Sequence, residues 1–217
     1  MKKHIGPTIT RRYLLQAATA LTLGPTITTR DSRAESPPSQ TASKSFAEVV
    51  RKRAMIRAYK SDPVPEEKLQ QLLKYAVRAP SGGNLQPWEF VVVKSPEVKD
   101  KLAKAAMNQT SVTTAPVIIV TCADIQRAGS QAGTRGSFIS LIDTAFASLL
   151  ILLGAVEQDL GACFVASYNA EEVAKFLGLP DHVRPVGLIT IGYAAEPPRR
   201  APTKKIPLRQ LVHTDKW

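Results

Sequence analysis

Two short stretches contain the residues whose types and spacing could bind a charged, ring-containing ligand. The first reads RKRAMIRAY over residues 51–59 and places Arg51, Arg53 and Arg57 near the end of a predicted helix. A guanidinium group makes paired hydrogen bonds to phosphate oxygens, and several such groups together favour a doubly charged phosphate. The stretch therefore predicts a phosphate-binding element.

The second stretch reads APSGGNLQPWEF over residues 79–90, between a predicted helix and a predicted strand. Its glycines let the backbone approach a flat ligand closely. Ser81, Asn84 and Gln86 can each donate and accept hydrogen bonds, which suits a heteroaromatic ring edged with carbonyls and nitrogens. Taken singly, each stretch is more typical of a helix end or turn with arginines facing solvent.

Other chemistries lack their motifs in this sequence. None of the three histidines lies at metal-ligand spacing, and neither C-x-x-C nor the G-x-S-x-G nucleophile elbow occurs. The glycine-rich stretch 129–136 matches no phosphate-binding motif and is predicted to be a flexible loop. Cys122 and Cys163 lie in apolar strands, where we expect buried thiols, or a disulfide if they face one another in an oxidising compartment.

The remaining chain alternates between helical and extended patterns. Five helices are predicted, over residues 45–53, 63–77, 96–106, 137–158 and 170–179, and four strands over 89–93, 116–123, 162–166 and 185–193. The helix 137–158 is apolar all round, but its unbroken apolar run of 145–156 is too short to span a bilayer. We therefore expect it in a core or in a homodimer interface.

The N-terminal residues 1–34 have the layout of a secretory signal peptide. Arg11 and Arg12 directly precede a short apolar run, as in twin-arginine signals, and 35–43 is a linker rich in Pro and Ser. We expect the signal to direct export to the periplasm, leaving 44–217 as the folded domain. Without residues 1–34, the net charge falls from +11 to +6 and is dispersed, so we do not expect nucleic-acid binding.

The two stretches together resemble the nitroreductase-like family of FMN-dependent oxidoreductases. The segments KRAMIRAYKSDPVPEEKL and APSGGNLQPWEFVVV carry the resemblance, and LGLP, the GY that closes the last strand and KKIPLRQLVH support it. It spans about residues 44–213. The family implies an α+β fold, a mixed sheet flanked by helices, in an intertwined homodimer with FMN at the interface.

The resemblance also implies which residues bind FMN. Arg53 and Arg57 would hold the phosphate and ribityl chain, and Lys205 would reach the phosphate from the C-terminal tail. The loop at residues 80–86 would approach the flavin from the partner subunit. The full set of implied cofactor-binding residues is Arg53, Ala54, Met55, Arg57, Pro80, Ser81, Gly82, Asn84, Gln86, Asn108, Ala166, Ser167 and Lys205.

Three departures from the family pattern affect the expected site. Met55 stands where many members have Ser, Lys205 stands where Arg is commoner, and few charged residues occur near Asn108, where some members have Lys. These departures leave FMN as the expected cofactor but weaken any inference about the substrate.

The family implies a two-step cycle in which a small donor reduces FMN and leaves, and a nitroaromatic or quinone then takes the electrons. No side chain stands out as an obligatory acid or base. Because an exported enzyme meets little NAD(P)H, we expect either a different donor or an enzyme that oxidises a substrate and passes the electrons onward. The alternatives are a flavin-modifying or flavin-storing protein of the same fold, and a secreted binding domain without redox activity.

Overall fold

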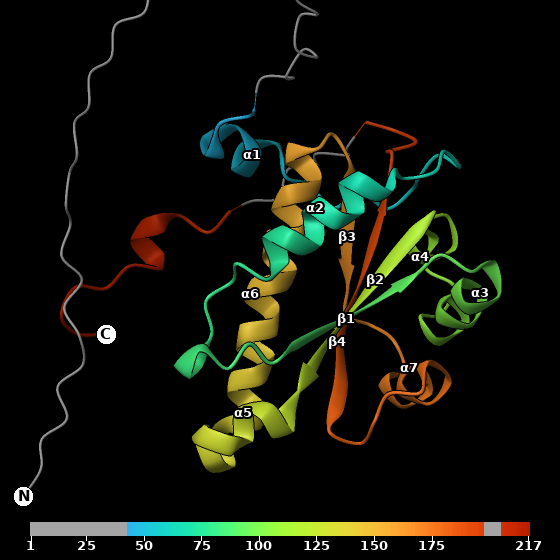
Figure 1. Ribbon diagram of the computed structural model, residues 1–217. Coiled ribbons are helices and arrows are strands. Elements are labelled where there is room, and N and C mark those ends of the chain that lie inside the picture. Colours follow the sequence, from blue (N-terminus) through green and yellow to red (C-terminus); the bar gives the residue numbers. More distant parts are fainter. Residues whose placement is uncertain (1–42, 198–204) are drawn as a thin grey trace, which may run out of the picture. The chain divides into compact units, whose positions relative to one another are not determined.

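The computed structural model describes residues 43–197 and 205–217 (Figure 1). The predicted signal peptide 1–34, and all of the predicted linker except Ser43, lie outside these residues. Residues 43–197 are built on a four-stranded sheet with the order β1-β2-β4-β3. The strands are β1 (Trp88–Val93), β2 (Val117–Asp124), β3 (Gly161–Val165) and β4 (Val183–Gly192).

Strands β2 and β4 form the centre of the sheet. Every residue of β2 is buried, as its continuous apolar run predicts for a strand covered on both faces. β2 pairs with β1 and β4, and β4 pairs with β3, all in the antiparallel sense. One parallel bridge, between Met55 and Ala162, places an extended segment beside β3 and makes the strand pairing mixed.

Helices cover both faces of the sheet: α2 and α6 lie on one side, and α3, α4 and α7 on the other (Figure 1). The neighbouring residues Ile118 and Ile119 of β2 point to opposite faces, so they belong to two separate apolar clusters, with Leu102 and Leu72 respectively. This confirms the predicted α+β fold. The helices are α1 (Phe46–Lys52), α2 (Glu66–Ala76), α3 (Pro96–Ala105), α4 (Thr110–Thr113), α5 (Ile125–Ala132), α6 (Gly136–Glu157) and α7 (Ala170–Leu177), with short η1 (Gly82–Asn84), η2 (Gly133–Arg135) and η3 (Leu208–Gln210).

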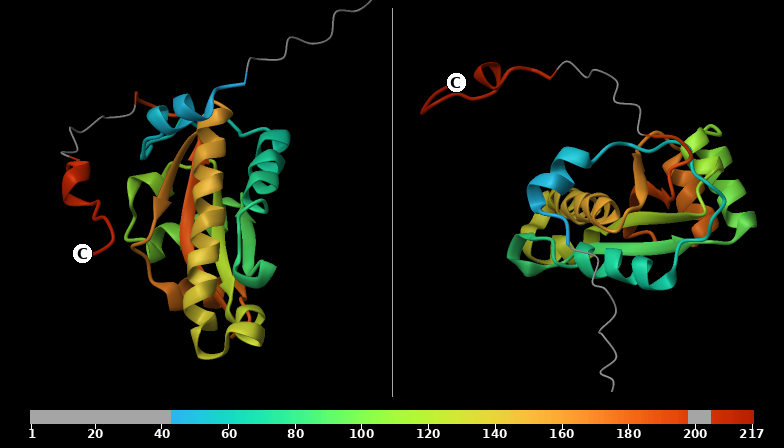
Figure 2. Two further views of the ribbon diagram at one scale, coloured as in Figure 1. Left: turned by 90° about the vertical axis from the view of Figure 1, so that its left-hand side faces the viewer. Right: turned by 90° about the horizontal axis from the view of Figure 1, so that it is seen from above.

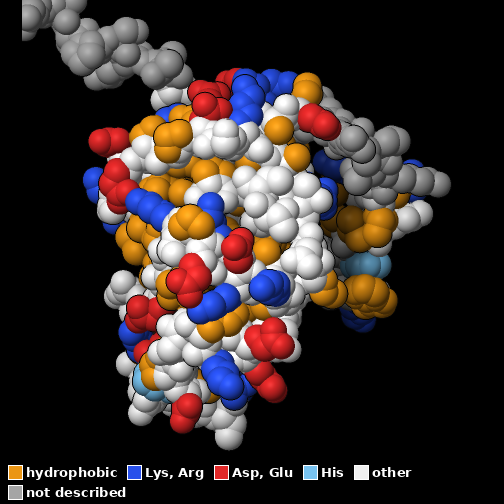
Figure 3. All heavy atoms as spheres, turned by 90° about the vertical axis from the view of Figure 1, so that its right-hand side faces the viewer, with side chains coloured by type: hydrophobic (Ala, Val, Ile, Leu, Met, Phe, Trp, Pro, Cys, Tyr) orange, Lys and Arg blue, Asp and Glu red, His pale blue; other side chains and the backbone are white. Residues whose placement is uncertain are grey.

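The face formed by α3, α4 and α7 carries acidic and basic side chains close together (Figure 3). On α3, for example, Lys101 pairs with Glu97 one helical turn away, at 3.0 Å. Positive and negative side chains are therefore interspersed on this face, as the dispersed charge of the sequence predicts.

The long helix α6 runs along the sheet with a different partner at each end. Its 22 residues extend about 33 Å at 1.5 Å per residue. Figure 2 shows α1 beside one end and α5 beside the other. At the C-terminal end, the ammonium groups of Lys44 and Lys68 donate to the carbonyl oxygens of Glu157 (2.7 Å) and Gln158 (2.6 Å). These bonds satisfy carbonyls that have no partner within the helix.

The two faces of α6 differ. Among the described residues, Gly133–Glu157 is the one helix long and apolar enough to cross a membrane, so its length does not exclude a span as expected from the run 145–156. Half of its most apolar stretch is nevertheless buried inside the chain, as in a core helix. The predicted core role is therefore confirmed. The outward face of α6 exposes large apolar side chains, namely Phe138, Leu141, Ile142, Phe146 and Leu149. Its role as an interface stays a prediction.

The prediction of a flexible loop over 129–136 was wrong. This stretch ends α5, forms η2 and begins α6. Asp124 caps α5 by accepting from the backbone N–H of Arg127 at 2.8 Å. A methyl group on Gly136 would lie 2.5 Å from the Cα atom of Gly129, so the glycines allow two helices to approach at backbone distance. Glycine thus serves helix crossing here rather than mobility.

This close approach predicts a contrast between two glycine substitutions. Gly136→Ala is expected to lower the free energy of unfolding by about 1–3 kcal/mol, because the new methyl group meets the backbone of α5. Gly129→Ala is the matched control, since its added methyl group meets nothing within 4 Å beyond the adjacent backbone of its own helix. It is expected to leave stability unchanged or raise it by up to about 1 kcal/mol. Urea denaturation measures the free energy of unfolding of both variants. Equal values for the two would contradict the close approach of α5 and α6 at Gly136.

Candidate functional site

The segment after α1 forms the first half of the candidate site. Arg53 ends α1 with its backbone N–H bonded to the carbonyl oxygen of Val49 at 2.9 Å, and the chain then becomes extended. The N–H of Ile56 donates to the carbonyl oxygen of Ala162 at 3.0 Å, which holds the segment against β3. Gly161 permits this contact, because a methyl group there would lie within 2.9 Å of Ile56.

Tyr59 anchors the far end of the same segment. Its hydroxyl lies 2.7 Å from the carbonyl oxygen of Ile56, and 3.0 and 2.8 Å from the carbonyl and hydroxyl oxygens of Thr190 in β4. Burial raises the pKa of the Tyr59 phenol well above its ordinary value, although the hydrogen bond to Thr190 opposes the rise. The phenol therefore stays protonated, and it fixes the backbone on either side of Arg57.

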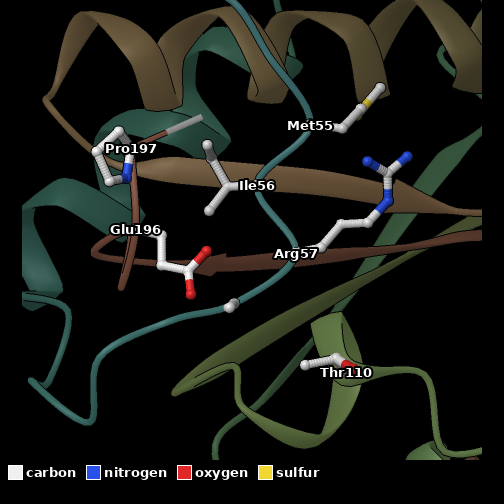
Figure 4. A pocket seen from close by; sticks show the side chains of 7 residues that line it. Met55, Ile56, Arg57, Thr110, Glu196 and Pro197 are labelled. Atoms are coloured by element: carbon white, nitrogen blue, oxygen red, sulfur yellow. The ribbon is translucent and has the colours of Figure 1, made fainter. Parts of the chain in front are cut away.

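A cavity of 490 Å³ opens beside this segment (Figure 4). Figure 4 shows the guanidinium group of Arg57 turned towards the Met55 side chain, with Glu196 and Pro197 on the other side of the segment. Residues two apart in an extended chain share a face, which explains the pairing of Met55 with Arg57. The cavity is lined by Met55, Ile56, Arg57, Ala58, Thr110, Glu196 and Pro197.

Arg57 also acts on a buried thiol of β3. Burial raises the pKa of Cys163, whereas the positive charge of Arg57 and a hydrogen bond from Ser111 draw it partly back down. Cys122, which is more deeply buried, has its pKa raised to about 12, chiefly by burial. Both cysteines are free and buried, which confirms the expected buried thiols in preference to a disulfide.

Three further predicted residues lie near the carboxyl end of β3. Ala166 and Ser167 follow the strand directly and are exposed. The side-chain amide of Gln109 donates to the carbonyl oxygen of Ser167 at 2.8 Å, which brings the α3–α4 turn and its Asn108 to the same place. Asn108 is exposed with a φ of 51°, so its side chain projects from a tight turn.

The loop 80–86 forms the second half of the candidate site and lies beside α6 near α5. Gly83, Asn84 and Gln86 all have a positive φ, at 58°, 57° and 49°. The N–H of Gly82 donates to the carboxylate of Asp143 at 3.1 Å. The predicted contact residues of this loop are exposed except for the half-buried Ser81: Pro80, Ser81, Gly82, Asn84 and Gln86.

Within one chain, the two halves lie at opposite ends of α6. The loop contacts Asp143, near the N-terminal end, whereas Met55 and Ile56 contact the residues that follow its C-terminal end. Along α6, Asp143 and the C-terminal end are about 20 Å apart at 1.5 Å per residue. Lys205 is exposed, and residues 198–204, which connect it to Pro197, are outside the described part of the chain, so its role stays a prediction.

Sequence reasoning missed several residues around both halves. Tyr59, Thr110 and Glu196 bear on the first half, and Asp143 and Arg127 contact the loop. Asp143 alone gave a usable signal, as a carboxylate within an apolar helical run. Among the residues that the structure describes, no group of three His, Cys, Asp or Glu side chains could hold a metal ion.

Comparison with protein families and curated proteins gives consistent results. A model of the nitroreductase family matches residues 50–114 and 106–193. The chain is 36% identical over 189 residues to an NADH dehydrogenase of Thermus thermophilus, covering 74% of this chain and 91% of that protein. It is 27% identical over 176 residues to an FMN reductase (NADPH) of Bacillus subtilis, covering 75% of this chain and 70% of that protein.

Solved structures share the same fold. A nitroreductase family protein from Clostridium difficile superposes with a TM-score of 0.72 at 30% identity, covering 80% of this chain and all of that one. Nitroreductase A from Vibrio parahaemolyticus also gives a TM-score of 0.72, at 27% identity, covering 79% and 76% of the two chains.

The raised pKa of Cys122 predicts slow alkylation in the folded state. At pH 9 a thiol with the ordinary pKa of 9.0 is half ionised, whereas a pKa of about 12 leaves roughly one molecule in a thousand ionised. We expect iodoacetamide to label Cys122 several hundredfold (~500-fold) more slowly in the folded protein than in urea. The same pKa difference contributes stability that is present below pH 9 and lost as the pH rises towards 12.

Mass spectrometry of the labelled peptides measures the rate at each cysteine separately. Fast labelling of Cys122 in folded protein at pH 9 would contradict its burial.

Proposed function

The chain belongs to the nitroreductase family, and we propose that it is an FMN-dependent oxidoreductase that passes electrons from a small donor to nitroaromatic, quinone or similar acceptors in two steps. Oxidoreductase activity and an FMN cofactor are what family membership supports. The observation that carries the proposal for this chain is the first half of the site, in which Arg57 projects beside an open cavity of 490 Å³.

The residues present fit FMN. A cavity of this volume lies within the range of about 300–1,000 Å³ typical of small-molecule sites. Arg53 and Arg57 offer guanidinium groups for a phosphate and for ring or ribityl oxygens. The loop offers exposed glycine backbone at Gly82 and Gly83 that could lie flat against a ring. When bound, FMN would supply the hydride chemistry.

The exposed apolar face of α6 supports a homodimer. Two halves of a site held apart within one chain can meet if a second copy brings its loop to the cavity of the first. Phe138, Phe146 and Leu149 expose large apolar side chains of the kind that subunit interfaces bury. We propose that this face pairs the subunits and that each cofactor contacts both chains.

The chain's own groups would bind and orient rather than transfer protons. Tyr59 and Cys163 both have their pKa values raised by burial, so they stay protonated near neutral pH. Ala166 and Ser167 are exposed at the end of β3, where their backbone can face the ring. Because the cavity is open to solvent, donor and acceptor can use it in turn.

Residues 1–34 support a further proposal, that the enzyme is exported through the twin-arginine pathway and works in the periplasm. The curated relatives named above use NADH or NADPH by name. An exported enzyme would meet little of either, so we propose that its physiological donor is a different small reductant.

Replacing Arg57 tests the cofactor site. The purified protein is expected to be yellow, and Arg57→Ala to weaken FMN binding roughly 10- to 100-fold, since a hydrogen bond from a charged group contributes about 1.5–3 kcal/mol. Arg184→Ala, which removes an exposed arginine from β4, is the matched control. Fluorescence titration of FMN measures both. A mature protein that stays colourless with added FMN would refute the proposed function.

The donor hypothesis requires a separate measurement. Stopped-flow loss of the flavin's visible absorbance, without oxygen, is expected to show slow, weakly saturating reduction by NADH and NADPH, because neither is the proposed donor. Dithionite provides the control for complete reduction. Fast reduction that saturates at low NADH concentration would overturn this hypothesis while leaving the oxidoreductase assignment intact.

A further inference from the structure

We propose that Asp143 and Arg127 are positioning residues that hold the loop 82–86 at its two ends, in the conformation that meets FMN. The inference rests on the proposed function, because it assumes that this loop contacts the cofactor. Neither residue touches the cavity beside Arg57. They would act on the cofactor only through the loop backbone, at Gly82 and Gln86.

The loop has a backbone that needs to be held. Asn84 and Gln86 have side chains yet adopt φ values of 57° and 49°, a region in which an L-residue is less stable than in ordinary backbone. The loop has its own hydrogen bonds: the N–H groups of Gln86 and Asn84 donate to the hydroxyl and carbonyl oxygens of Ser81, both at 3.0 Å. The N–H of Leu85 donates to the carbonyl of Gly82 at 3.1 Å, and the side-chain amide of Gln86 donates to two oxygens of Asn84 at 3.2 and 3.4 Å. These bonds shape the turn but do not attach it to the rest of the molecule, which contacts from outside the loop must do.

Asp143 holds the first end. Its side chain belongs to α6 and is nearly buried, with 4% of the residue exposed. A buried carboxylate is costly unless donors satisfy it, and the N–H of Gly82 donates to it at 3.1 Å. The fit leaves little room at Gly82, because a methyl group there would lie 3.2 Å from Ile139 and 3.9 Å from Asp143.

Arg127 holds the second end. Its guanidinium group donates to the carbonyl oxygen of Gln86 at 2.8 Å. The same group pairs with Glu89 of β1 and, at 3.3 Å, with Asp124 at the end of β2. Three partners in different directions fix the planar guanidinium, so it can define where Gln86 lies. The side chain therefore ties the loop to two strands of the sheet.

Helix α5 contacts the loop at a second residue, Gly83, in addition to Gln86. Gln131 lies one turn after Arg127, so both side chains project from the same face of the helix. A methyl group on Gly83 would lie 2.8 Å from the side-chain oxygen of Gln131, which shows how closely the loop packs there. The glycine-rich segment thus supports the candidate site without lining its cavity.

The test uses conservative and disruptive variants of the FMN-loaded protein. Asp143→Leu removes the acceptor while keeping the number and branching of the side-chain heavy atoms, and Arg127→Met removes the guanidinium group while keeping the aliphatic stem. Each is expected to weaken FMN binding about tenfold or more and to change the visible circular dichroism of bound FMN. Asp143→Asn keeps an acceptor oxygen and is expected to stay within about threefold of wild type. Asp100→Leu and Arg184→Met, at exposed positions, are the controls.

Urea denaturation of each variant shows whether a change in FMN binding arises from a displaced loop or from a loss of folding stability. Without urea and at a saturating concentration of FMN, the variants are folded and loaded. Under these conditions we expect an altered circular dichroism signal of the bound FMN. Wild-type affinity and an unchanged signal in both Asp143→Leu and Arg127→Met would overturn the proposal. If Asp143→Leu does not fold, Arg127→Met decides alone. A wild-type protein that binds no FMN would instead refute the proposed function, so the two failures are distinguishable.

Discussion

The length of α6 determines which parts of this chain can meet. A helix of 22 residues, packed along the sheet, holds the loop 80–86 at one end and the segment 53–59 at the other. Its stiffness means that no side-chain rearrangement joins them within one chain. A site made of both halves therefore needs two copies of the chain, and the exposed apolar face of the same helix offers the surface through which the copies could pair.

Each half of the candidate site packs against α6 or the sheet through a close approach of two backbone segments. Gly161 lets the segment around Ile56 lie directly on β3, and Gly136 lets α5 cross α6 against Gly129. A larger residue at Gly161 or Gly136 would push an element outwards and move the candidate site residues with it. The precision of both halves is thus set by residues that have no functional groups of their own.

The sequence indicated the elements well because their apolar runs are long and the helix starts have recognisable caps, such as Ser45 on α1. Helix α5 was missed, since its glycines are typical of loops until a crossing partner is known. Arg57 and the loop residues were predicted from their chemistry and the family resemblance, and their contact with a cofactor stays a prediction. Tyr59 was not, because its role depends on Thr190, which lies 131 residues away in the chain. Contacts at that separation leave no local pattern.

The two ends of α6 are held by chemically different bonds. Lysine ammonium groups hold the end near α1 through backbone carbonyls, with Lys44 also paired to Asp159 at 2.9 Å. At the loop end the acceptors are carboxylates, of Asp143 directly and of Asp124 and Glu89 through Arg127. A backbone carbonyl is present whichever residue occupies the position, whereas a side-chain carboxylate is lost when its residue is replaced. Substitutions would therefore affect the two ends unequally: replacing Glu157 keeps the carbonyl that Lys44 binds, whereas replacing Asp143 by an apolar residue removes the acceptor of the Gly82 N–H.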